Sequence, residues 1–530
     1  MSKQILSGSK AREELEKGID TLCNTVKITL GPKGKNVILE RNGNPIITND
    51  GVSIAKEITL KSPHANMGAK IICEASTKTN ETAGDGTTTA CVLAQSLYKN
   101  GIKNIVAGAN PIILGKGIRK ATKTVLEALE TMSQKIKSNK DIEQVATISC
   151  QDKEIGKLIA NAFEKVGNDG VITLEEGNKS TTELEVVTGI QFDKGFSSPY
   201  MANVPQKQTC EMENPNILIT DQKIETLNQI LPILEKVAQN NGKLAIIAPD
   251  YSEEVIATLV VNKLRGSLNI VTIKSPAFGE QRHEIMSDLC ILCGANYISN
   301  ELNKTLEDTD ISDLGSCKQL IVTKDTTTIV EGKGEDVLIK DRIALIKALQ
   351  KDCTNDYEKK LYQTRLTKLA GGVAVIKVGA TTEIEMNEKK LRLEDALSAT
   401  KSAIEEGTVI GGGCAYIKTI PSVVKLIDTL NGDEKTGASI VLNALSAPLK
   451  QIAENSGFSG EVVLEKVSQN QADLNYGFDA LNGVFCSLRD CGILDPKKVT
   501  RSALENAVSV VSTLLTTECI VCEEPSTNMQ

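Results

Sequence analysis

Residues 83–90 read Ala-Gly-Asp-Gly-Thr-Thr-Thr-Ala and lead directly into a helical pattern at 90–97. The glycine at 86 permits a backbone whose N–H groups point one way, and a helix N-terminus adds positive potential. Three threonine hydroxyls add donors for phosphate, and Asp85 offers the hard oxygen that Mg²⁺ prefers. Taken alone, the stretch is equally compatible with an N-capping aspartate before a threonine-rich first turn.

Three other segments carry turns of a similar kind. Residues 29–34 (Thr-Leu-Gly-Pro-Lys-Gly) end a predicted helix, residues 49–51 (Asn-Asp-Gly) follow a predicted strand, and residues 411–413 (Gly-Gly-Gly) open a predicted helix. For the triple glycine a flexible hinge is the alternative interpretation. None of them matches G-x-x-x-x-G-K-[ST], so the chain carries no P-loop signature.

Asp395 lies in a predicted helix whose apolar stripe is formed by Leu393, Leu397 and Ile404. At 100° per residue its side chain points away from that stripe. The helical pattern by itself therefore favours a solvated carboxylate at this position.

The bulk properties exclude several classes of protein. A chain of 530 residues exceeds one hydrophobic core, so two or three domains are expected. The net charge of -8 and the 3% aromatic content argue against a nucleic-acid binder. No apolar run is long enough to span a membrane, and the first residues do not resemble a signal or transit segment. We expect a bacterial cytoplasmic protein without a membrane or nucleic-acid partner.

The order of the patterns predicts helical ends around an α/β middle. Short β-branched runs alternate with helical patterns between about 170 and 380, which is typical of an α/β module. Before and after this region the 3.6-residue periodicity dominates. The clearest helical segments are 15–30, 87–97, 115–129, 388–406, 436–456 and 500–515. We therefore expect one helical domain built from both ends, with the rest inserted into it.

Two CxxC pairs, at 290–293 and 519–522, raise the question of a zinc site. Their intervening residues are Ile-Leu and Ile-Val, which favour buried strands over metal-binding turns. Most of the other cysteines stand singly among apolar residues, as expected in a reducing compartment. Structural thiols are therefore favoured, and no metal site is predicted from cysteine.

Two helical segments of the middle region, 227–238 and 253–262, carry more apolar residues than a helix packed on a sheet requires. Either the helices are deeply buried or they expose an apolar surface. The pattern alone favours burial.

Six strings, in this order and spacing, resemble segments of the group I chaperonins of the bacterial GroEL type. The resemblance covers residues 4–522, nearly the whole chain, and the set is highly specific. The strings are 29–34, 50–53 (Asp-Gly-Val-Ser), 83–90, 369–379 (Leu-Ala-Gly-Gly-Val-Ala-Val-Ile-Lys-Val-Gly), 394–397 (Glu-Asp-Ala-Leu) and 492–496 (Gly-Ile-Leu-Asp-Pro). A group II chaperonin is less favoured, since residues 188–373 leave no spare length for a built-in helical lid.

The resemblance implies a multidomain fold with three parts. An all-α equatorial ATP-binding domain would comprise 1–131 and 406–530, and a small α+β intermediate hinge domain would comprise 132–187 and 374–405. The α/β apical domain, 188–373, would bind clients and a co-chaperonin. Glycines 371, 372 and 407 would serve as hinges between these domains.

The resemblance also implies an ATPase with Mg²⁺ and K⁺. Asp395 would orient the attacking water with help from Asp50, and Asp85 would bind the metal. The nucleotide would contact Thr29, Leu30, Gly31, Pro32, Asn49, Asp85, Gly86, Thr87, Thr88, Thr89, Ile148, Ser149, Gly412, Asp479, Ala480, Ile493 and Asp495. Two positions depart from the family pattern, with Asn49 in place of a frequent lysine and Asp479 in place of a common asparagine.

The implied partners are further copies of the chain in two stacked seven-membered rings, unfolded client proteins and a co-chaperonin of the GroES type. Lys194 and Glu383 would bridge neighbouring subunits before ATP arrives. Clients would bind Phe196, Tyr200, Met201, Leu231, Leu234, Ile256, Val260 and Val261. The alternative from another class is a scaffold that binds apolar clients without productive hydrolysis. The C-terminal Glu523–Gln530 lacks the Gly-Gly-Met repeats of bacterial relatives.

Overall fold

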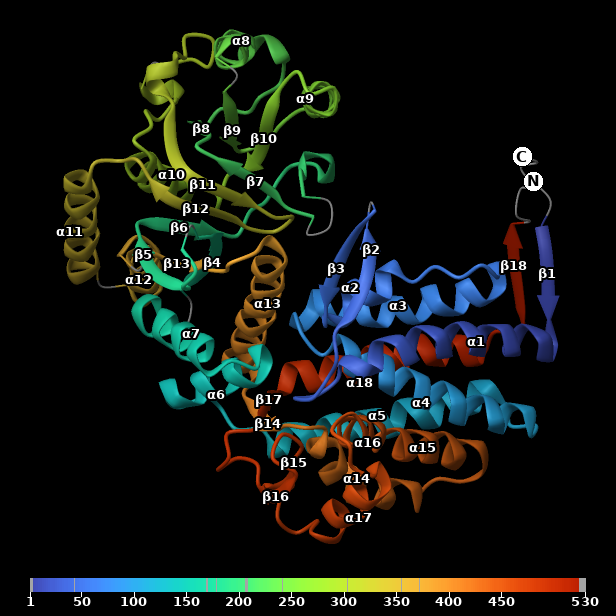
Figure 1. Ribbon diagram of the computed structural model, residues 1–530. Helices are drawn as coiled ribbons and strands as arrows, with labels where there is room; N and C mark the ends of the chain where they lie inside the picture. Colours follow the sequence, from blue (N-terminus) through green and yellow to red (C-terminus); the bar gives the residue numbers. More distant parts are fainter. Residues whose placement is uncertain are drawn as a thin grey trace. The chain divides into compact units, whose positions relative to one another are not determined.

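The structure is a computed structural model, and it divides the chain into two compact units. The first comprises Met1–Asn161, Glu176–Glu183 and Val378–Gln530, and the second Ala162–Glu175 and Leu184–Lys377. The described residues are 3–41, 43–167, 170–177, 179–204, 208–240, 242–302, 304–353, 355–370 and 372–523. The first unit is thus built from both ends of the chain (Figure 1).

The first unit is mainly helical. Its long helices α1, α3, α4, α5 and α18 pack side by side, and α15 lies against α4 and α5 (Figure 1). Its helices are α1 (Gly8–Val26), α2 (Gly51–Glu57), α3 (Pro63–Ala83), α4 (Thr87–Val106), α5 (Pro111–Met132), α6 (Asn139–Cys150), α13 (Glu383–Glu406), α14 (Cys414–Ile427), α15 (Gly432–Ala444), α16 (Ala447–Asn455), α17 (Gly460–Gln469) and α18 (Lys497–Leu515). Helix α7 (Lys153–Val166) runs across the boundary between the units.

Two-stranded antiparallel sheets accompany these helices. One of them joins the two ends of the described chain, because β1 pairs with β18. Within the described residues the pairs are β1 (Lys3–Ser7) with β18 (Cys519–Glu523), β2 (Val37–Arg41) with β3 (Asn44–Thr48), β14 (Thr408–Ile410) with β17 (Leu494–Pro496), and β15 (Tyr476–Asp479) with β16 (Val484–Ser487).

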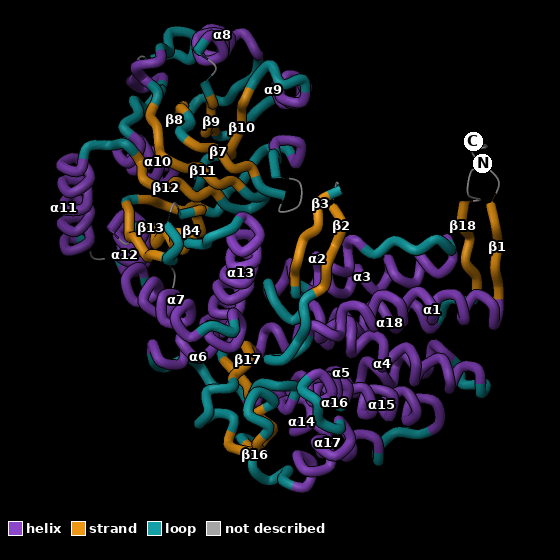
Figure 2. The backbone as a smooth tube through the Cα atoms, in the orientation of Figure 1, coloured by secondary structure: helices purple, strands orange, loops and turns teal. Residues whose placement is uncertain are grey.

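The second unit is an α/β module around a seven-stranded sheet in the order β10-β9-β8-β11-β12-β6, with β7 paired to β11 (Figure 2). Strand β9 is parallel to both of its neighbours, and the other pairings are antiparallel. The strands are β6 (Gly189–Phe192), β7 (Cys210–Glu213), β8 (Asn216–Ile219), β9 (Lys243–Ala248), β10 (Asn269–Lys274), β11 (Gly315–Val322) and β12 (Thr327–Gly332).

Five helices complete this unit, and a small three-stranded sheet contains β13 between β4 and β5. The helices are α8 (Leu231–Gln239), α9 (Glu253–Leu264), α10 (Glu280–Cys293), α11 (Asp336–Asp352) and α12 (Asp356–Ala370). The strands of the small sheet are β4 (Val171–Glu176), β5 (Glu183–Val187) and β13 (Val373–Val378).

The multidomain fold class is confirmed, while three local expectations are wrong. The segment 436–456 is two helices, because Pro448 near the start of α16 cannot continue the helix before it. The segment 227–238 begins as a 3₁₀ turn at Leu227–Gln229 before α8. The Cys290–Cys293 pair lies on α10 and not on a strand, whereas the other CxxC pair lies on β18 as expected.

The three-domain division is finer than the two compact units and stays a prediction. Gly371 and residues 524–530 lie outside the described residues, so neither that hinge position nor the tail is described. Among the described helices, none combines the length and the apolar character that a bilayer crossing requires.

Glycines set the distance between α1 and α3. A Cβ added to Gly18 would lie 1.8 Å from the backbone oxygen of Ala65, and one at Gly68 would lie 2.4 Å from that of Leu15. Such separations are impossible without moving a helix backbone. Only hydrogen at these two positions permits the observed packing.

We therefore predict that Gly18→Ala destabilises the first unit, by about 1–3 kcal/mol as for other overpacked cores. The matched control is Gly115→Ala on α5, where an added Cβ meets only Arg119 side-chain atoms at 3.8 Å. The control should be neutral or slightly stabilising because alanine favours the helix. Thermal unfolding of both variants checks this, and equal midpoints would contradict the packing argument.

Candidate functional site

A cavity of about 390 Å³ lies within the first unit. All nineteen positions predicted for nucleotide binding and catalysis line it, although they come from distant parts of the sequence. They are Thr29, Leu30, Gly31, Pro32, Asn49, Asp50, Asp85, Gly86, Thr87, Thr88, Thr89, Ile148, Ser149, Asp395, Gly412, Asp479, Ala480, Ile493 and Asp495. The fold therefore brings together the whole predicted set.

The 83–90 stretch forms a loop that ends at the N-terminus of α4. The N-cap of α4 is Gly86, at φ 81°, and no side chain caps this helix. The interpretation of Asp85 as an N-cap is therefore wrong, and the N–H groups of the first turn keep their capacity to bind an anion. A Cβ on Gly86 would lie 2.6 Å from Val499, which excludes larger residues.

Helix α2 begins beside α4. Its N-cap is Asp50, whose carboxylate accepts hydrogen bonds from the N–H groups of Val52 (3.1 Å) and Ser53 (3.0 Å). A Cβ on Gly51 would approach the Thr88 hydroxyl to 2.4 Å, so glycine permits the close contact of the two helix starts. Because Asp50 already holds its own helix, its orientation in the cavity is fixed.

Asp85 and Asp395 face the same cavity as Asp50, and the charges of these neighbouring carboxylates affect the pKa values of Asp85 and Asp395. Burial, followed by the charges of Asp50 and Asp85, raises the pKa of Asp395 well above its usual value. Burial also raises the pKa of Asp85, against hydrogen bonds from the Gly86 N–H and the Ser149 hydroxyl. The expectation of a solvated carboxylate at 395 is wrong, because α13 directs this side chain into the cavity.

These residues could hold Mg²⁺ through a carboxylate, with the remaining ligands supplied by water and phosphate oxygens. Within the described ranges no three acidic, histidine or cysteine side chains are arranged to hold an ion by themselves. Mg²⁺ is commonly held by one or two carboxylates, with water and substrate phosphates completing its octahedron. Asp85 beside the α4 N-terminus suits that pattern, and a cation there would offset the repulsion among the carboxylates.

The 29–34 loop is held by residues that the sequence reasoning missed. The side-chain amide of Asn455, at the end of α16, donates to the backbone oxygens of Lys27 and Leu30, both at 2.9 Å. Gln451 in turn donates to the Asn455 side chain at 2.9 Å. A polar pair more than 420 residues away in sequence thus fixes the loop, and no local pattern reveals it.

The side of the cavity formed by β15 contains Asp479, at a position where asparagine is common in the family pattern. Its carboxylate accepts from the N–H groups of Leu481 (3.0 Å) and Asn482 (3.2 Å) and from the Asn482 side chain (2.7 Å). Both oxygens are engaged in its own turn. Asp479 therefore shapes the wall by closing the turn after β15, and its contact with a nucleotide stays a prediction.

Asp495, on β17, has a strongly raised pKa. Burial raises its pKa to about 7, Asp85 adds to the rise, and a hydrogen bond from the Gly412 N–H opposes it. This carboxylate is therefore partly protonated near neutral pH.

Helix α13, which carries Asp395, is attached to the 83–90 loop through small residues. A Cβ on Gly84 would lie 2.2 Å from the Ser398 Cβ, and the Ser402 hydroxyl donates to the Ala83 oxygen at 3.0 Å. These contacts lie on the same side of α13 as Asp395, at intervals of three and four residues. They fix the position of Asp395 relative to the 83–90 loop.

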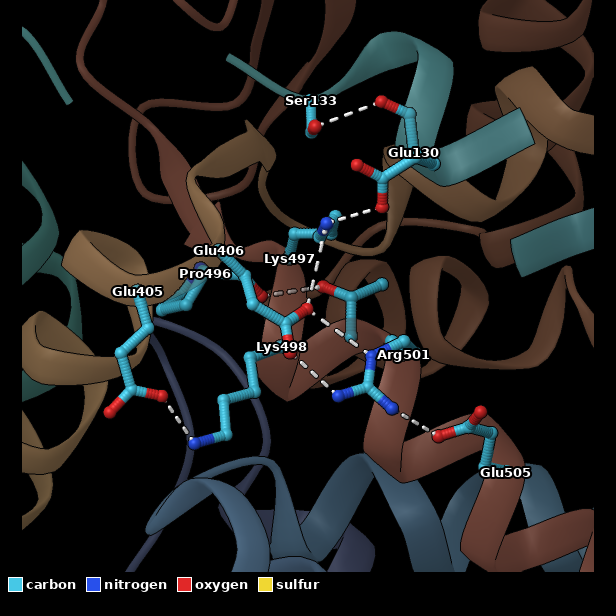
Figure 3. Close-up of polar contacts among 10 residues, drawn as sticks. Glu130, Ser133, Glu405, Glu406, Pro496, Lys497, Lys498, Arg501 and Glu505 are labelled. Carbon is cyan, nitrogen blue, oxygen red and sulfur yellow. Dashed lines mark hydrogen bonds and ion pairs between the residues drawn. The ribbon is translucent and has the colours of Figure 1, made fainter. Parts of the chain in front are cut away.

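The C-terminal end of α13 is held by charges (Figure 3). Glu406 pairs with Arg501 at 2.7 Å and with the buried Lys497 at 3.6 Å, and Lys497 also contacts Glu130. Glu405 pairs with Lys498 at 2.6 Å. The three cations belong to the first turns of α18, directly after Asp495, so the network links α13 to the opposite side of the cavity.

Further lining residues were not predicted. One of them is Arg392, which precedes Asp395 by three positions on the same face of α13 and pairs with Glu388. A helical wheel centred on Asp395 would have found it. The other unpredicted positions are Gly51, Gln151, Gly413, Ala415, Tyr416, Pro448, Ile452, Phe478, Leu481, Asn482, Cys491, Pro496, Val499 and Thr500.

The model of the TCP-1/cpn60 chaperonin family matches residues 22–525. The chain belongs to this family. Its recognition as a chaperonin is confirmed, and a group I assignment is consistent with the match. The fold of this chaperonin is also similar to that of chaperonin gp146 from a Pseudomonas aeruginosa bacteriophage, EL, solved in the presence of ATP-BeFx. The two chains share 21% identity and a TM-score of 0.68, over 98% of this chain and 99% of gp146.

In the second unit of this chaperonin the predicted client-binding residues differ in exposure. Tyr200 is 67% exposed, Val261 44% and Leu231 39%, while Phe196 and Ile256 are half-buried. Met201, Leu234 and Val260 lie in the hydrophobic core, and their role in client binding stays a prediction. The exposed side of α9 instead includes Leu264, 69% exposed and three residues after Val261.

The predicted inter-subunit pair is not tested by a single chain. Lys194 lies in the second unit, with its ammonium group 5.7 Å from the ring centre of Phe278. Glu383 lies in the first turn of α13, in the first unit. Their pairing across subunits stays a prediction.

The raised pKa of Asp495 generates a pH prediction. Because the folded-state pKa of about 7 lies above the ordinary aspartate value of 3.8, the favourable contribution of the neutral acid is lost as pH rises through 7. Asp495→Asn should therefore raise the unfolding temperature of the nucleotide-free protein at pH 8, by about 2–4 °C for each kcal/mol regained. The effect should diminish towards pH 4.

Thermal scans between pH 4 and pH 8 measure this effect. The control is Asp428→Asn, which removes an exposed carboxylate of the same unit after α14. A stabilisation by Asp495→Asn that is equal at all pH values, or absent at pH 8, would contradict the electrostatic origin.

Proposed function

We propose that this protein is an ATP-dependent chaperonin, in which ATP hydrolysis in the first unit controls the capture and enclosure of unfolded proteins by the second. The observation that carries the proposal is the convergence of all nineteen predicted residues on one cavity. The chaperonin gp146, which has the same fold, was solved with ATP-BeFx, and this supports the assignment of the cavity to a nucleotide.

Each wall of the cavity suits a different part of ATP. The N–H groups at the start of α4 and the hydroxyls of Thr87–Thr89 suit the phosphates, because they combine donors with a positive helix end. Gly412 and Asp495 suit the ribose, where the carboxylate accepts from a hydroxyl. The turn closed by Asp479 suits the base through Ala480 and Ile493.

The hydrolytic residue in this proposal is Asp395. Burial strengthens its ionised form as an acceptor for the proton of an attacking water, and a cation near Asp50 and Asp85 would offset the repulsion that favours the neutral acid. Asp50, held as the N-cap of α2, assists in orienting that water. Mg²⁺ bound at Asp85, with K⁺ nearby, would supply charge neutralisation for the phosphates.

The second unit supplies the client surface. The exposed Tyr200, Leu231, Val261 and Leu264 present apolar contacts that recognise unfolded chains by hydrophobicity and not by sequence. We propose that a co-chaperonin competes for this surface, and that the chain works in two seven-membered rings of identical subunits. Lys194 and Glu383 would bridge neighbours within a ring before ATP binds.

Replacement of Asp395 by Ala is the decisive experiment. ATP binding should remain, because the phosphate donors are backbone and threonine groups, while steady-state hydrolysis should fall by about 10²–10⁴-fold, as for loss of a general base. Phosphate release in the presence of Mg²⁺ and K⁺ measures the rate, and a fluorescent ATP analogue measures binding.

Glu394→Ala is the matched control, since it removes the adjacent carboxylate, which does not line the described cavity. It should retain hydrolysis. Unchanged turnover in Asp395→Ala would refute the role of this residue. Absence of hydrolysis in the unmodified protein would instead favour a scaffold that binds clients without turnover.

For the client surface we predict that Val261→Glu weakens capture of a chemically denatured protein at least about threefold, because it removes apolar contact area from α9. The matched control is Leu338→Glu, which changes a 50% exposed leucine of α11 in the same unit. Suppression of aggregation by the assembled protein without nucleotide is the measurement. Equal losses in both variants would indicate that α9 has no special role.

A further inference from the structure

Two cysteines lie together at the edge of the cavity, and neither belongs to the nucleotide residues predicted above. The Sγ atoms of Cys486, on β16, and Cys491, in the turn that follows, are 3.1 Å apart. Cys491 is exposed and lines the cavity, while Cys486 is half-buried. Both are free thiols.

The backbone holds this pair in place. The turn between the two residues is closed by hydrogen bonds from the N–H of Cys491 to Ser487 (3.1 Å), of Gly492 to Arg489 (3.1 Å) and of Ile493 to Leu488 (2.8 Å). On the other side, Cys486 pairs with Gly477 in the β15–β16 hairpin. Because both ends are fixed, the thiols meet without the entropy cost of closing a flexible loop.

We propose that Cys486 and Cys491 form a dithiol modification site, which two-electron oxidants such as hydrogen peroxide or small-molecule disulfides convert to a disulfide. A disulfide needs sulfurs about 2.05 Å apart, so they must approach by only about 1 Å. A metal site is a weaker interpretation, because the described residues contain no group of three suitable ligands.

The chemistry balances with peroxide as the oxidant. The sulfur of Cys491, the exposed partner, attacks one peroxide oxygen and becomes a sulfenic acid, while the other oxygen leaves as water. The sulfur of Cys486 then attacks that of Cys491, and the hydroxyl leaves as water with the Cys486 proton. The net change is two thiols and one peroxide to one disulfide and two waters. Burial, and then the hydrogen-bonded Cys491, raises the pKa of Cys486 to about 12, so this thiol stays protonated until its proton passes to the leaving hydroxyl in the second step.

The bond would connect the β15–β16 hairpin to the turn that precedes β17, at one side of the cavity. Cys486 belongs to the hairpin that carries Asp479, and Cys491 directly precedes Gly492 and Ile493 on the way to β17. Closing the sulfurs moves the Cys491 turn towards β16 and away from its reduced position beside the cavity. We expect the oxidised protein to bind nucleotide more weakly, and this second part rests on the proposed function.

The test uses the full-length assembled protein. It is oxidised with hydrogen peroxide or oxidised glutathione, and the remaining thiols are blocked under denaturing conditions. Trypsin cleaves after Lys466, Arg489 and Lys497, so the disulfide would join the peptides 467–489 and 490–497. We expect this linked pair as the dominant cross-link, lost after dithiothreitol and lost in Cys486→Ser and Cys491→Ser. The control Cys519→Ser, which removes an exposed cysteine of β18, should retain it.

Absence of the linked pair, or its replacement by separate modification of the two cysteines, would overturn the dithiol site. Binding of fluorescent ADP to the same samples tests the coupling. Oxidation should lower its affinity at least about threefold, with recovery on reduction and no change in Cys486→Ser. An unchanged affinity despite the cross-link would overturn the coupling. Failure of the reduced protein to bind ADP would overturn the proposed function and leave the peptide result intact.

Discussion

Carboxylates gather in a cavity of the first unit, and burial and mutual repulsion raise the pKa values of Asp85, Asp395 and Asp495. Such a cluster is costly unless a cation or a proton compensates it. Facing it are the N–H groups at the start of α4, which favour an anion. The cavity is thus electrostatically incomplete in two complementary ways, and the proposed magnesium-bound polyphosphate would satisfy both.

The surrounding fold maintains this costly arrangement through close contacts and charge pairs. Glycines at 51, 84 and 86 allow backbones and small side chains to meet where any Cβ would collide. At the end of α13, Glu406 is held by Arg501 and Lys497 of α18. The helix that carries Asp395 is therefore attached to two walls of the same cavity. A structural change in the 83–90 loop can therefore be transmitted to α13 through these contacts.

Two parts of the structure carry side chains outside the expected pattern of contacts. The wall formed by β15 and β16 carries Asp479, satisfied within its own turn, and the adjacent thiols of Cys486 and Cys491. In the second unit, exposure is divided among the client residues. Tyr200 and Val261 reach the surface while Met201 and Leu234 support it from the core. The proposed recognition of apolar chains would tolerate such variation, because it requires apolar area and not defined hydrogen bonds.

Local sequence was sufficient for most of the long helices of the first unit. The 3.6-residue periodicity predicted α4, α5 and α18, and the resemblance to the group I chaperonins implied the nineteen site positions that line the cavity. The orientation of Asp395 and the Asn455 contacts to the 29–34 loop were decided by tertiary contacts. A helical wheel describes side-chain directions around one helix only. Burial and electrostatic interactions depend on neighbouring elements, which packing brings together from positions hundreds of residues apart in the sequence.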